Sequence, residues 1–567
     1  MNSQCNKHIS LLLLTQLLLA ALVSIPRTAT AATLSIKNTN YAIPSGAYFV
    51  SPNGNESNSG RSADSPWPVS KAIASAPSGA TIVFRGGTYR NVRLAVNKRL
   101  ILQAYPNEQP WLKGSIVIDG WVPEGSIWRK DDWNYSFPPN QQPQAIDPNY
   151  PMAGYRDMVY INGVALKQVA SKANVAPGTF YVDAGNKKLY IGSNPAGNTV
   201  EATVQTEGVV LWNSNASGSV VRGLGLVHYA DRGIQIGAAG ITVENNTLAW
   251  NGVDGITIQS SDVKVHGNNI SYNGRKGVGG IRSHRLLLEN NVISHNNVEN
   301  FATNWSASGV KILWSDGAVV RGNMVDSNKS MGLWADESCS NITFVNNVTR
   351  NNRIGIYFEI SHKAIIASNV VYNNRIAGIM ILNASAARIY NNTLARNHAN
   401  LLVQETSRNN TKSTEIAEGI TWITRNTVVK NNILWHSSGP MFYAPGCATK
   451  EPSNLMVPTT NNNAYYRSSA SRPVNLIWAL SGNQCSQSFN SLASFQSATG
   501  LESNSLDIVN SNDPFFVDAS ANDFRLTSGS PALGRGEPLP ADVANAIGVA
   551  AEIPVDLGAL NNLEDDG

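Results

Sequence analysis

The sequence has little charge, few cysteines and, after its first thirty residues, no run apolar enough to span a membrane. Charged residues make up 14% of the 567 positions, the net charge is +4, and lysines and arginines do not cluster. This charge is too mild for a nucleic-acid footprint, so no nucleic-acid partner is expected. No cysteine spacing resembles a zinc site, and we expect no metal or cofactor.

Residues 1–31 are predicted to be a cleaved signal peptide. Lys7 and His8 precede an apolar run over residues 11–23, and Ala29-Thr30-Ala31 is a small-x-small cleavage signal. The run is too short to cross a bilayer comfortably. The mature chain is therefore expected to be secreted or periplasmic, with no membrane association once the signal is removed. In such a compartment Cys447 and Cys485 can form a disulfide.

What the sequence does contain is many Asn and Gly residues and an internal repeat. The repeat is marked by an asparagine, in most cases the second of an Asn-Asn pair, at Asn246, Asn269, Asn291, Asn323, Asn347, Asn369, Asn392 and Asn432. A period of about 22 residues is that of a solenoid coil with three short strands and tight corners, where asparagine tolerates left-handed backbone and stacks on the asparagine above. Two longer intervals indicate corner insertions, near 298–307 and 404–421. The predicted fold is all-β, a right-handed parallel β-helix.

Other segments complete the predicted architecture. Residues 32–119 form an N-terminal cap, with a helix over 70–76, and the first coils. Residues 120–201 form a small β insertion, whose aromatic residues either wall a substrate cleft or make the insertion's own core. The regular coils and the cleft occupy 202–432, and irregular coils with a C-terminal cap over 513–531 occupy 433–567.

One outward column of the predicted coils carries two acids. The runs Gly332-Leu-Trp-Ala-Asp336 and Gly355-Ile-Tyr-Phe-Glu359 align by their glycines, and the two carboxylates are 23 residues apart. Alternation along a strand places the residues two and four after each glycine outward, so Asp336 and Glu359 are expected on adjacent strands about 4.8 Å apart. A carboxyl separation of about 5 Å is that of a retaining glycosidase.

Their neighbours predict how the acids divide the work. Glu359 lies between Asp336 and Leu382, and a like charge and an apolar neighbour both favour its protonated form. Lys311, diagonally above Asp336, favours ionisation of that acid. Asp336 is therefore the predicted nucleophile and Glu359 the general acid/base. The predicted substrate-binding residues, which stack on a sugar, exclude water or line the site, are Trp334, Tyr357, Lys311, His362, Trp305 and Arg282.

The paired motif resembles the catalytic pair of glycoside hydrolase family 120, β-xylosidases built on a right-handed β-helix. The wider chain resembles the pectate-lyase-like superfamily of β-helix proteins. The resemblance implies that Asp336 is the nucleophile and Glu359 the acid/base, and that the substrate is an oligo- or polysaccharide.

Two alternatives remain open at this point. In a Ca²⁺-dependent polysaccharide lyase or uronate epimerase the carboxylates would hold Ca²⁺, and Lys311 or Arg282 would abstract a proton from an acidic sugar. One acid pair supplies few of the 6–8 oxygens that Ca²⁺ takes. The second alternative is a non-catalytic carbohydrate-binding solenoid.

Overall fold

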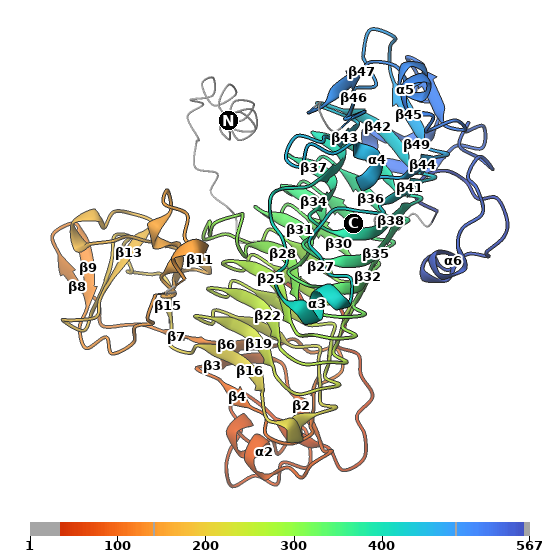
Figure 1. The fold of residues 1–567 in the computed structure, drawn as a ribbon. Coiled ribbons are helices and arrows are strands. Elements are labelled where there is room, and N and C mark those ends of the chain that lie inside the picture. Colours follow the sequence, from red (N-terminus) through yellow and green to blue (C-terminus); the bar gives the residue numbers. More distant parts are fainter. Residues whose placement is uncertain (1–33, 140–141, 482–484, 561–567) are drawn as a thin grey trace.

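The computed structural model describes residues 34–139, 142–481 and 485–560, and the predicted signal peptide lies outside these residues. Three long parallel sheets wind into a right-handed solenoid (Figure 1). Sheet A runs from β1 (Tyr48–Val50) to β44 (Thr459–Asn461), sheet B from β3 (Gly87–Arg90) to β48 (Leu506–Val509), and sheet C from β4 (Leu94–Ala95) to β47 (Gln487–Phe489). One continuous apolar core fills the space between them. Among the described residues, no helix combines the length and apolar composition needed to span a bilayer.

Stacked asparagines keep the coils in register at the corner between sheets A and B. In each coil the side-chain oxygen of a buried asparagine accepts from the backbone N–H and the amide of the asparagine one coil earlier, as Asn347 Oδ1 does from Asn323, at 3.0 Å each. This ladder passes through Asn246, Asn268, Asn291, Asn323, Asn347, Asn369, Asn392, Asn432 and Asn463. It crosses both long intervals, because the insertions leave the solenoid at other corners.

A second ladder, at the corner between sheets B and C, was not predicted. It passes through Asn251, Asn273, Asn296, Asn328, Asn352, Asn374 and Asn397. One predicted marker was also wrong by one residue, because Asn268 and not Asn269 belongs to the first ladder. Gly267, with φ 67°, takes the left-handed position that the first asparagine of a pair fills elsewhere, so the ladder asparagine follows it directly.

The N-terminal end is closed by α2 (Val69–Ser75), as predicted, with Ala72 buried in the main core. The β insertion projects from the solenoid as two small sheets (Figure 1). It contains two antiparallel hairpins, β10 (Val159–Ile161) with β11 (Val164–Ala165), and β13 (Thr179–Asp183) with β14 (Lys188–Ile191). The aromatic residues mostly serve the insertion itself, since Trp133 and Phe180 are buried in its own core.

The prediction that residues 513–531 cap the C-terminal end is wrong. The helix α5 (Leu492–Thr499) contributes Leu492 and Phe495 to the main core. The segment after it turns back along the outside of the coils, where β49 (Phe516–Asp518) and β50 (Asp523–Leu526) pack on sheet B. The helix α6 (Ala541–Ile547) covers sheet A in the same way. Phe515 and Phe524 therefore bury outward-facing apolar residues of the coils rather than the open end.

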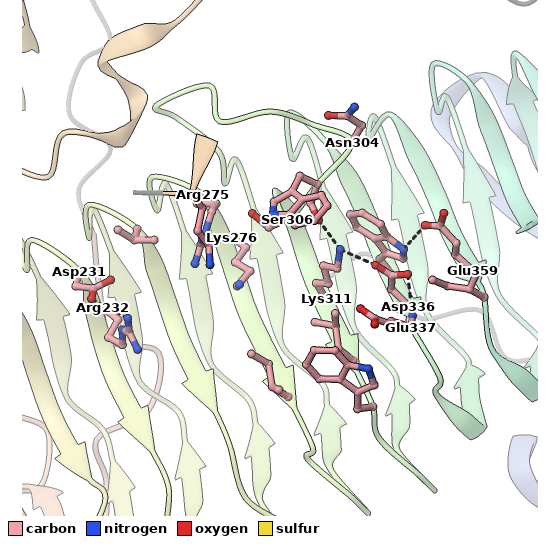
Figure 2. A pocket seen from close by; sticks show the side chains of 18 of the residues that line it. Asp231, Arg232, Arg275, Lys276, Asn304, Ser306, Lys311, Asp336, Glu337 and Glu359 are labelled. Atoms are coloured by element: carbon pink, nitrogen blue, oxygen red, sulfur yellow. Dashed lines mark hydrogen bonds and ion pairs between the residues drawn. The ribbon is translucent and has the colours of Figure 1, made fainter. Parts of the chain in front are cut away.

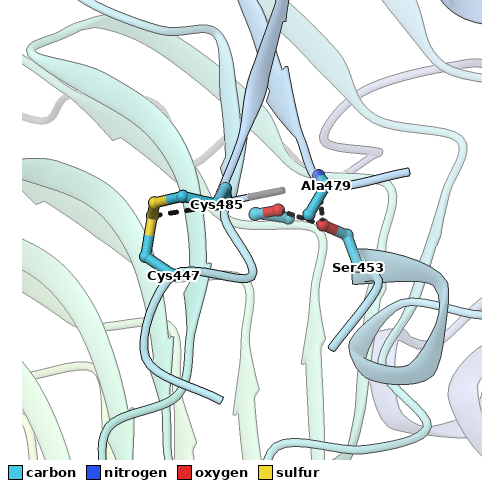
Figure 3. The surroundings of a disulfide bond; sticks show 5 residues. Cys447, Ser453, Ala479 and Cys485 are labelled. Carbon is cyan, nitrogen blue, oxygen red and sulfur yellow. Dashed lines mark hydrogen bonds between the residues drawn. A yellow bond between two sulfur atoms is a disulfide. The ribbon is translucent and has the colours of Figure 1, made fainter. Parts of the chain in front are cut away.

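Cys447 and Cys485 form a disulfide between two C-terminal loops (Figure 3). Nearby, Ser453 Oγ accepts from the backbone N–H of Ala479 at 2.7 Å and donates to the carbonyl of Ala444. The disulfide and this hydroxyl together tie loops of the irregular C-terminal coils to one another.

The ladder makes a testable contribution to stability. Asn347→Ala leaves the buried N–H of Asn323 without its acceptor, which costs about 1–3 kcal/mol. We expect a lower urea midpoint with an unchanged circular dichroism spectrum. Asn504→Ala, which removes an exposed amide, is the control. Equal midpoints for the two variants would contradict the role given to the ladder.

Candidate active site

The site lies on sheet C, and strand register places its residues. The strands concerned are β28 (Ser308–Leu313), β31 (Met331–Asp336), β34 (Ile354–Glu359) and β37 (Ala377–Leu382). Leu313 pairs with Asp336, and Glu359 with Leu382. Between β31 and β34 the last paired residues are Ala335 and Phe358, so Asp336 and Glu359 occupy the next position on adjacent strands. The predicted 23-residue step is confirmed.

Both carboxylates line a cavity of about 630 Å³ (Figure 2). The two predicted corner insertions reach it. Asn304, Trp305 and Ser306 come from the first, between β27 (Val292–Ser294) and β28, and Arg408 comes from the second, after β40 (Ala399–Gln404). The β insertion adds Pro139 and Arg156. The acids thus lie on a rigid sheet floor, and loops form the rim.

Asp336 is held as an ion pair. Its Oδ2 lies 2.7 Å from Lys311 Nζ, and its Oδ1 accepts from the backbone N–H of Glu337 at 2.7 Å. Lys311 also donates to the carbonyl of Trp305, and its ammonium lies 3.3 Å from the centre of the Trp334 ring. The Asp336 side chain is 12% exposed and that of Lys311 5%. Lys311 therefore provides a buried positive charge in direct contact with the Asp336 side chain.

Glu359 has a different environment. Its Oε2 accepts from Trp334 Nε1 at 3.2 Å, and its Oε1 lies 2.5 Å from Arg408. Burial, followed by the charge of Asp336, raises the pKa of Glu359, and Arg408 opposes this shift without cancelling it. Burial also holds the pKa of Tyr357 well above its ordinary value, so its hydroxyl stays a donor beside Glu359. The pKa of Glu359 therefore lies above its ordinary value, which is the direction that the sequence predicted.

Both acids are followed by residues with left-handed backbone. Glu337 has φ 36° and Ile360 has φ 37°. For the β-branched Ile360 this conformation is strained by about 1–3 kcal/mol. Such strain persists where the surroundings impose it and is concentrated at functional sites. Here it ends each strand abruptly and turns the Glu337 N–H back toward Asp336.

The structure brings most of the predicted residues together. Trp305, Lys311 and Trp334 line the cavity with the two acids, and the Trp305 side chain is exposed. Tyr357 lies behind Trp334, with its ring stacked 5.4 Å away.

Two predicted residues lie elsewhere. The guanidinium of Arg282 lies over Trp314, 4.9 Å from the ring centre. His362, on β35 (His362–Ala367) of sheet A, contacts Ser385 Oγ and does not line the cavity.

One predicted role is corrected. Trp334 was expected to stack on a pyranose ring or to exclude water, and the stacking role is wrong, because Lys311 covers its ring on one side and Tyr357 stacks on it. The residue is only 2% exposed. Its indole orients Glu359 and keeps water from the acids, and it has no free face for a sugar.

Sequence reasoning missed several charged cavity residues, among them Arg408, Arg232, Arg275 and Lys276. Arg408 lies in the predicted insertion at 404–421, whose sequence does not indicate which side chain reaches the cavity. Arg275 and Lys276 form a basic dipeptide within Gly274-Arg-Lys-Gly277, but a single dipeptide does not indicate a site. No group of three or more His, Cys, Asp or Glu side chains arranged for a metal occurs in the part of the chain that the structure describes.

Comparisons with known proteins agree on the fold. A family model described as "Right handed beta helix region" matches residues 232–394, the coils that carry the site. No curated protein matches the chain. Among solved structures, the complex of XylC with xylose is similar, with a TM-score of 0.60 and 16% identity over 74% of this chain and 83% of that one.

Two further structures are similar at lower scores. One is described as a glycoside hydrolase, with a TM-score of 0.45 and 10% identity over 64% of this chain and 94% of that one. The other is pectate lyase Pel9A, with a TM-score of 0.45 and 12% identity over 92% and 98%. The chain has the fold of the right-handed parallel β-helix superfamily.

The charge balance around Glu359 predicts an effect of removing Arg408. Its hydrogen bond and charge lower the pKa of Glu359, so Arg408→Gln should raise that pKa further and keep Glu359 protonated to higher pH. Carbon-13 NMR titration of the glutamate carboxyls measures this, with the signal assigned by its loss in Glu359→Gln. Arg285→Gln removes an exposed arginine paired with Asp262 and should leave the titration unchanged. A lower pKa in Arg408→Gln would contradict the account.

Proposed function

We propose that the chain is a retaining glycoside hydrolase of the β-xylosidase type, with Asp336 as nucleophile and Glu359 as general acid/base. The observation that carries the proposal is the pair of acids in register on adjacent strands at the floor of one cavity, where burial and the charge of Asp336 raise the pKa of Glu359. Parallel pairing puts their backbones about 4.8 Å apart, and retaining enzymes hold the two carboxyls about 5–5.5 Å apart.

The reaction follows from these positions. Asp336 attacks the anomeric carbon while Glu359 gives its proton to the glycosidic oxygen, so the bond to the leaving group breaks and a glycosyl ester of Asp336 forms. Glu359, now a carboxylate, takes a proton from a water molecule whose oxygen attacks the same carbon and releases Asp336. Lys311 stabilises the departing carboxylate, and Arg408 stabilises the ionised form of Glu359 between the two steps.

The resemblance to glycoside hydrolase family 120 supports the same assignment, because the matching positions carry the same two roles. The cavity volume lies within the range of about 300–1,000 Å³ usual for small-ligand sites. Xylose, the ligand in the complex with XylC, is the first sugar to test.

The alternative of Ca²⁺ held between the two acids is disfavoured by what already contacts them. Asp336 is paired with Lys311 and Glu359 with Arg408. A divalent cation at this position would meet two positive charges at close range. The alternative of a purely binding solenoid does not account for a buried acid pair, because like charges on adjacent strands destabilise a sheet.

We also propose that the chain is exported and cleaved after Ala31. The Cys447–Cys485 disulfide supports this, because such bonds persist in oxidising compartments. Protein recovered from an exporting host should begin at Ala32 by N-terminal sequencing, and retention of residues 1–31 would contradict the proposal.

The proposed function predicts different losses for the two acids. Asp336→Asn should lower kcat for aryl glycosides by a factor of at least about 10⁴. Glu359→Gln should slow the hydrolysis of substrates with poor leaving groups by a factor of about 10²–10⁴. The hydrolysis of activated aryl glycosides should be slowed much less, because their leaving groups depart without being protonated. Proton NMR of the first product should show retained anomeric configuration.

Matched controls are Asp262→Asn and Glu289→Gln, carboxylates on sheet A or its corner that pair with Arg285 and Arg321. Both should keep full activity, and EDTA should leave wild-type activity intact. Loss of activity in EDTA with an unsaturated, ultraviolet-absorbing product would reveal a lyase. A product with inverted anomeric configuration would contradict the nucleophile role of Asp336. If the folded Asp336→Asn and Glu359→Gln variants behaved like the wild type, the non-catalytic binding solenoid would be the remaining interpretation.

A further inference from the structure

The cavity extends from the acid pair toward the N-terminal coils, and this end is positively charged. Arg232, Arg275 and Lys276 line it beside Asp231 (Figure 2). Arg156 also lines it, and these four cations form ion pairs with the carboxylates of Asp231 and Asp254. Asp231 Oδ2 forms ion pairs with two arginines, Arg232 at 2.7 Å and Arg156 at 3.3 Å. Both carboxylate oxygens of Asp254 accept hydrogen bonds from the Arg275 guanidinium, at 3.2 and 3.0 Å. Four cations and two carboxylates leave an excess of two positive charges among these residues.

Lys276 is the least compensated of the four. Its one ion pair among the described residues is with Asp254 Oδ2 at 3.5 Å, and none of them accepts a hydrogen bond from it. Its side chain is only 8% exposed. Burial, and then the charge of Arg275, lower the pKa of Lys276 to about 8. A buried ammonium with three donors and no acceptor is costly unless an anion completes it.

The backbone makes room for this ammonium beside the catalytic residues. Lys276 begins β25 (Lys276–Ile281) and its side chain runs along its own strand, because a Cβ on Gly279 would lie 2.4 Å from Lys276 Cε and 3.0 Å from Nζ. Gly279 pairs across the sheet with Lys311, the partner of Asp336. The missing side chain at Gly279 therefore lets the Lys276 ammonium lie next to the Lys311 strand, inside the cavity.

A second unfilled donor lies in the same place. Arg232 Nε is buried and has no hydrogen-bond partner among the described residues. Arg232, at the start of β19 (Arg232–Ile236), and Lys276 lie in one register column, separated by Asp254 at the start of β22 (Asp254–Ile258). The donors thus line one side of the cavity, over neighbouring coils.

We propose that this end of the cavity is a subsite for the carboxylate of a uronic acid residue in the glycan, with Lys276 as its principal contact. β25 lies two strands before β31, or about 10 Å along the solenoid axis. The anion therefore belongs to a sugar next to the one attacked by Asp336 and not to the bond being cut. This inference rests on the proposed function for its place in catalysis, but binding of the anion does not need turnover.

The test is direct binding to the mature protein, measured by calorimetry or ligand-observed NMR with D-glucuronate, D-galacturonate and D-glucose at low salt. We expect the uronates to bind at least tenfold more tightly than glucose. Lys276→Met removes the charge, and Gly279→Ala displaces the ammonium without removing it, so both should weaken uronate binding at least tenfold. Lys264→Met, on an exposed position of sheet A, and Gly529→Ala, with open space around its Cα, are the matched controls.

The outcomes separate the subsite from the hydrolase. Equal affinity for uronates and glucose, or uronate binding unchanged by Lys276→Met and Gly279→Ala, overturns the subsite. Tighter binding of glucose 6-sulfate than of glucuronate overturns the carboxylate assignment in favour of a sulfate ester. If no glycan is hydrolysed but uronates still bind through Lys276, the subsite stands and the hydrolase fails.

If glycans are turned over, the ratio of kcat/KM for a uronate-bearing oligosaccharide to that for its neutral counterpart should fall at least tenfold in Lys276→Met. The ratio should not change in Lys264→Met. A ratio unaffected by Lys276→Met would place the uronate outside this end of the cavity and overturn the proposal.

Discussion

The hydrogen bonds between stacked asparagines fix the register on which the rest of this molecule depends. Each ladder amide engages the coil before and the coil after it, so a coil that slipped by one residue would leave several buried polar groups unpaired. The same ladder continues across coils with long insertions, as between Asn392 and Asn432. Loops can therefore be added at the cavity rim without disturbing the floor, and two acids on separate coils remain partners.

The register by itself places two like charges on adjacent strands, which would destabilise the sheet. The surroundings convert the pair into a site with two different acids. Lys311, buried beneath Trp305 and against Trp334, compensates Asp336. Glu359 is held by an indole N–H and by Arg408, an arginine on a loop with a side chain 41% exposed. A fixed cation at Asp336 and a loop-borne cation at Glu359 fit the roles proposed for the two residues, nucleophile and general acid/base.

The distribution of charge in the cavity also changes along the solenoid axis. The acid pair is close to electrically balanced by Lys311 and Arg408, whereas the coils before it carry excess positive charge. A β-helix is well suited to such a series, because each coil adds one outward position to a column about 4.8 Å further along. A linear glycan lying along the axis would meet the cationic residues and the acids in turn.

Much of the fold and of the candidate site could be predicted from the sequence, because these parts depend on local residue patterns. The glycine-started runs predicted the inward and outward positions and so the pairing of Asp336 with Glu359. The marker at Asn269 was wrong because a glycine can replace an asparagine in left-handed backbone. The pairing of Arg408 with Glu359 could not be predicted, since it depends on how an irregular loop folds back over the sheet. The burial of Trp334 depends on Lys311 lying across its ring, which strand alternation does not reveal.

The most direct test of the central claim is to trap the covalent intermediate. An activated aryl glycoside with fluorine at C2 of the sugar slows breakdown of a glycosyl ester more than its formation. After incubation and digestion, mass spectrometry of the peptides locates the label. The account predicts one equivalent of sugar on Asp336, while a label on another residue, or no label from any turned-over glycoside, would contradict it.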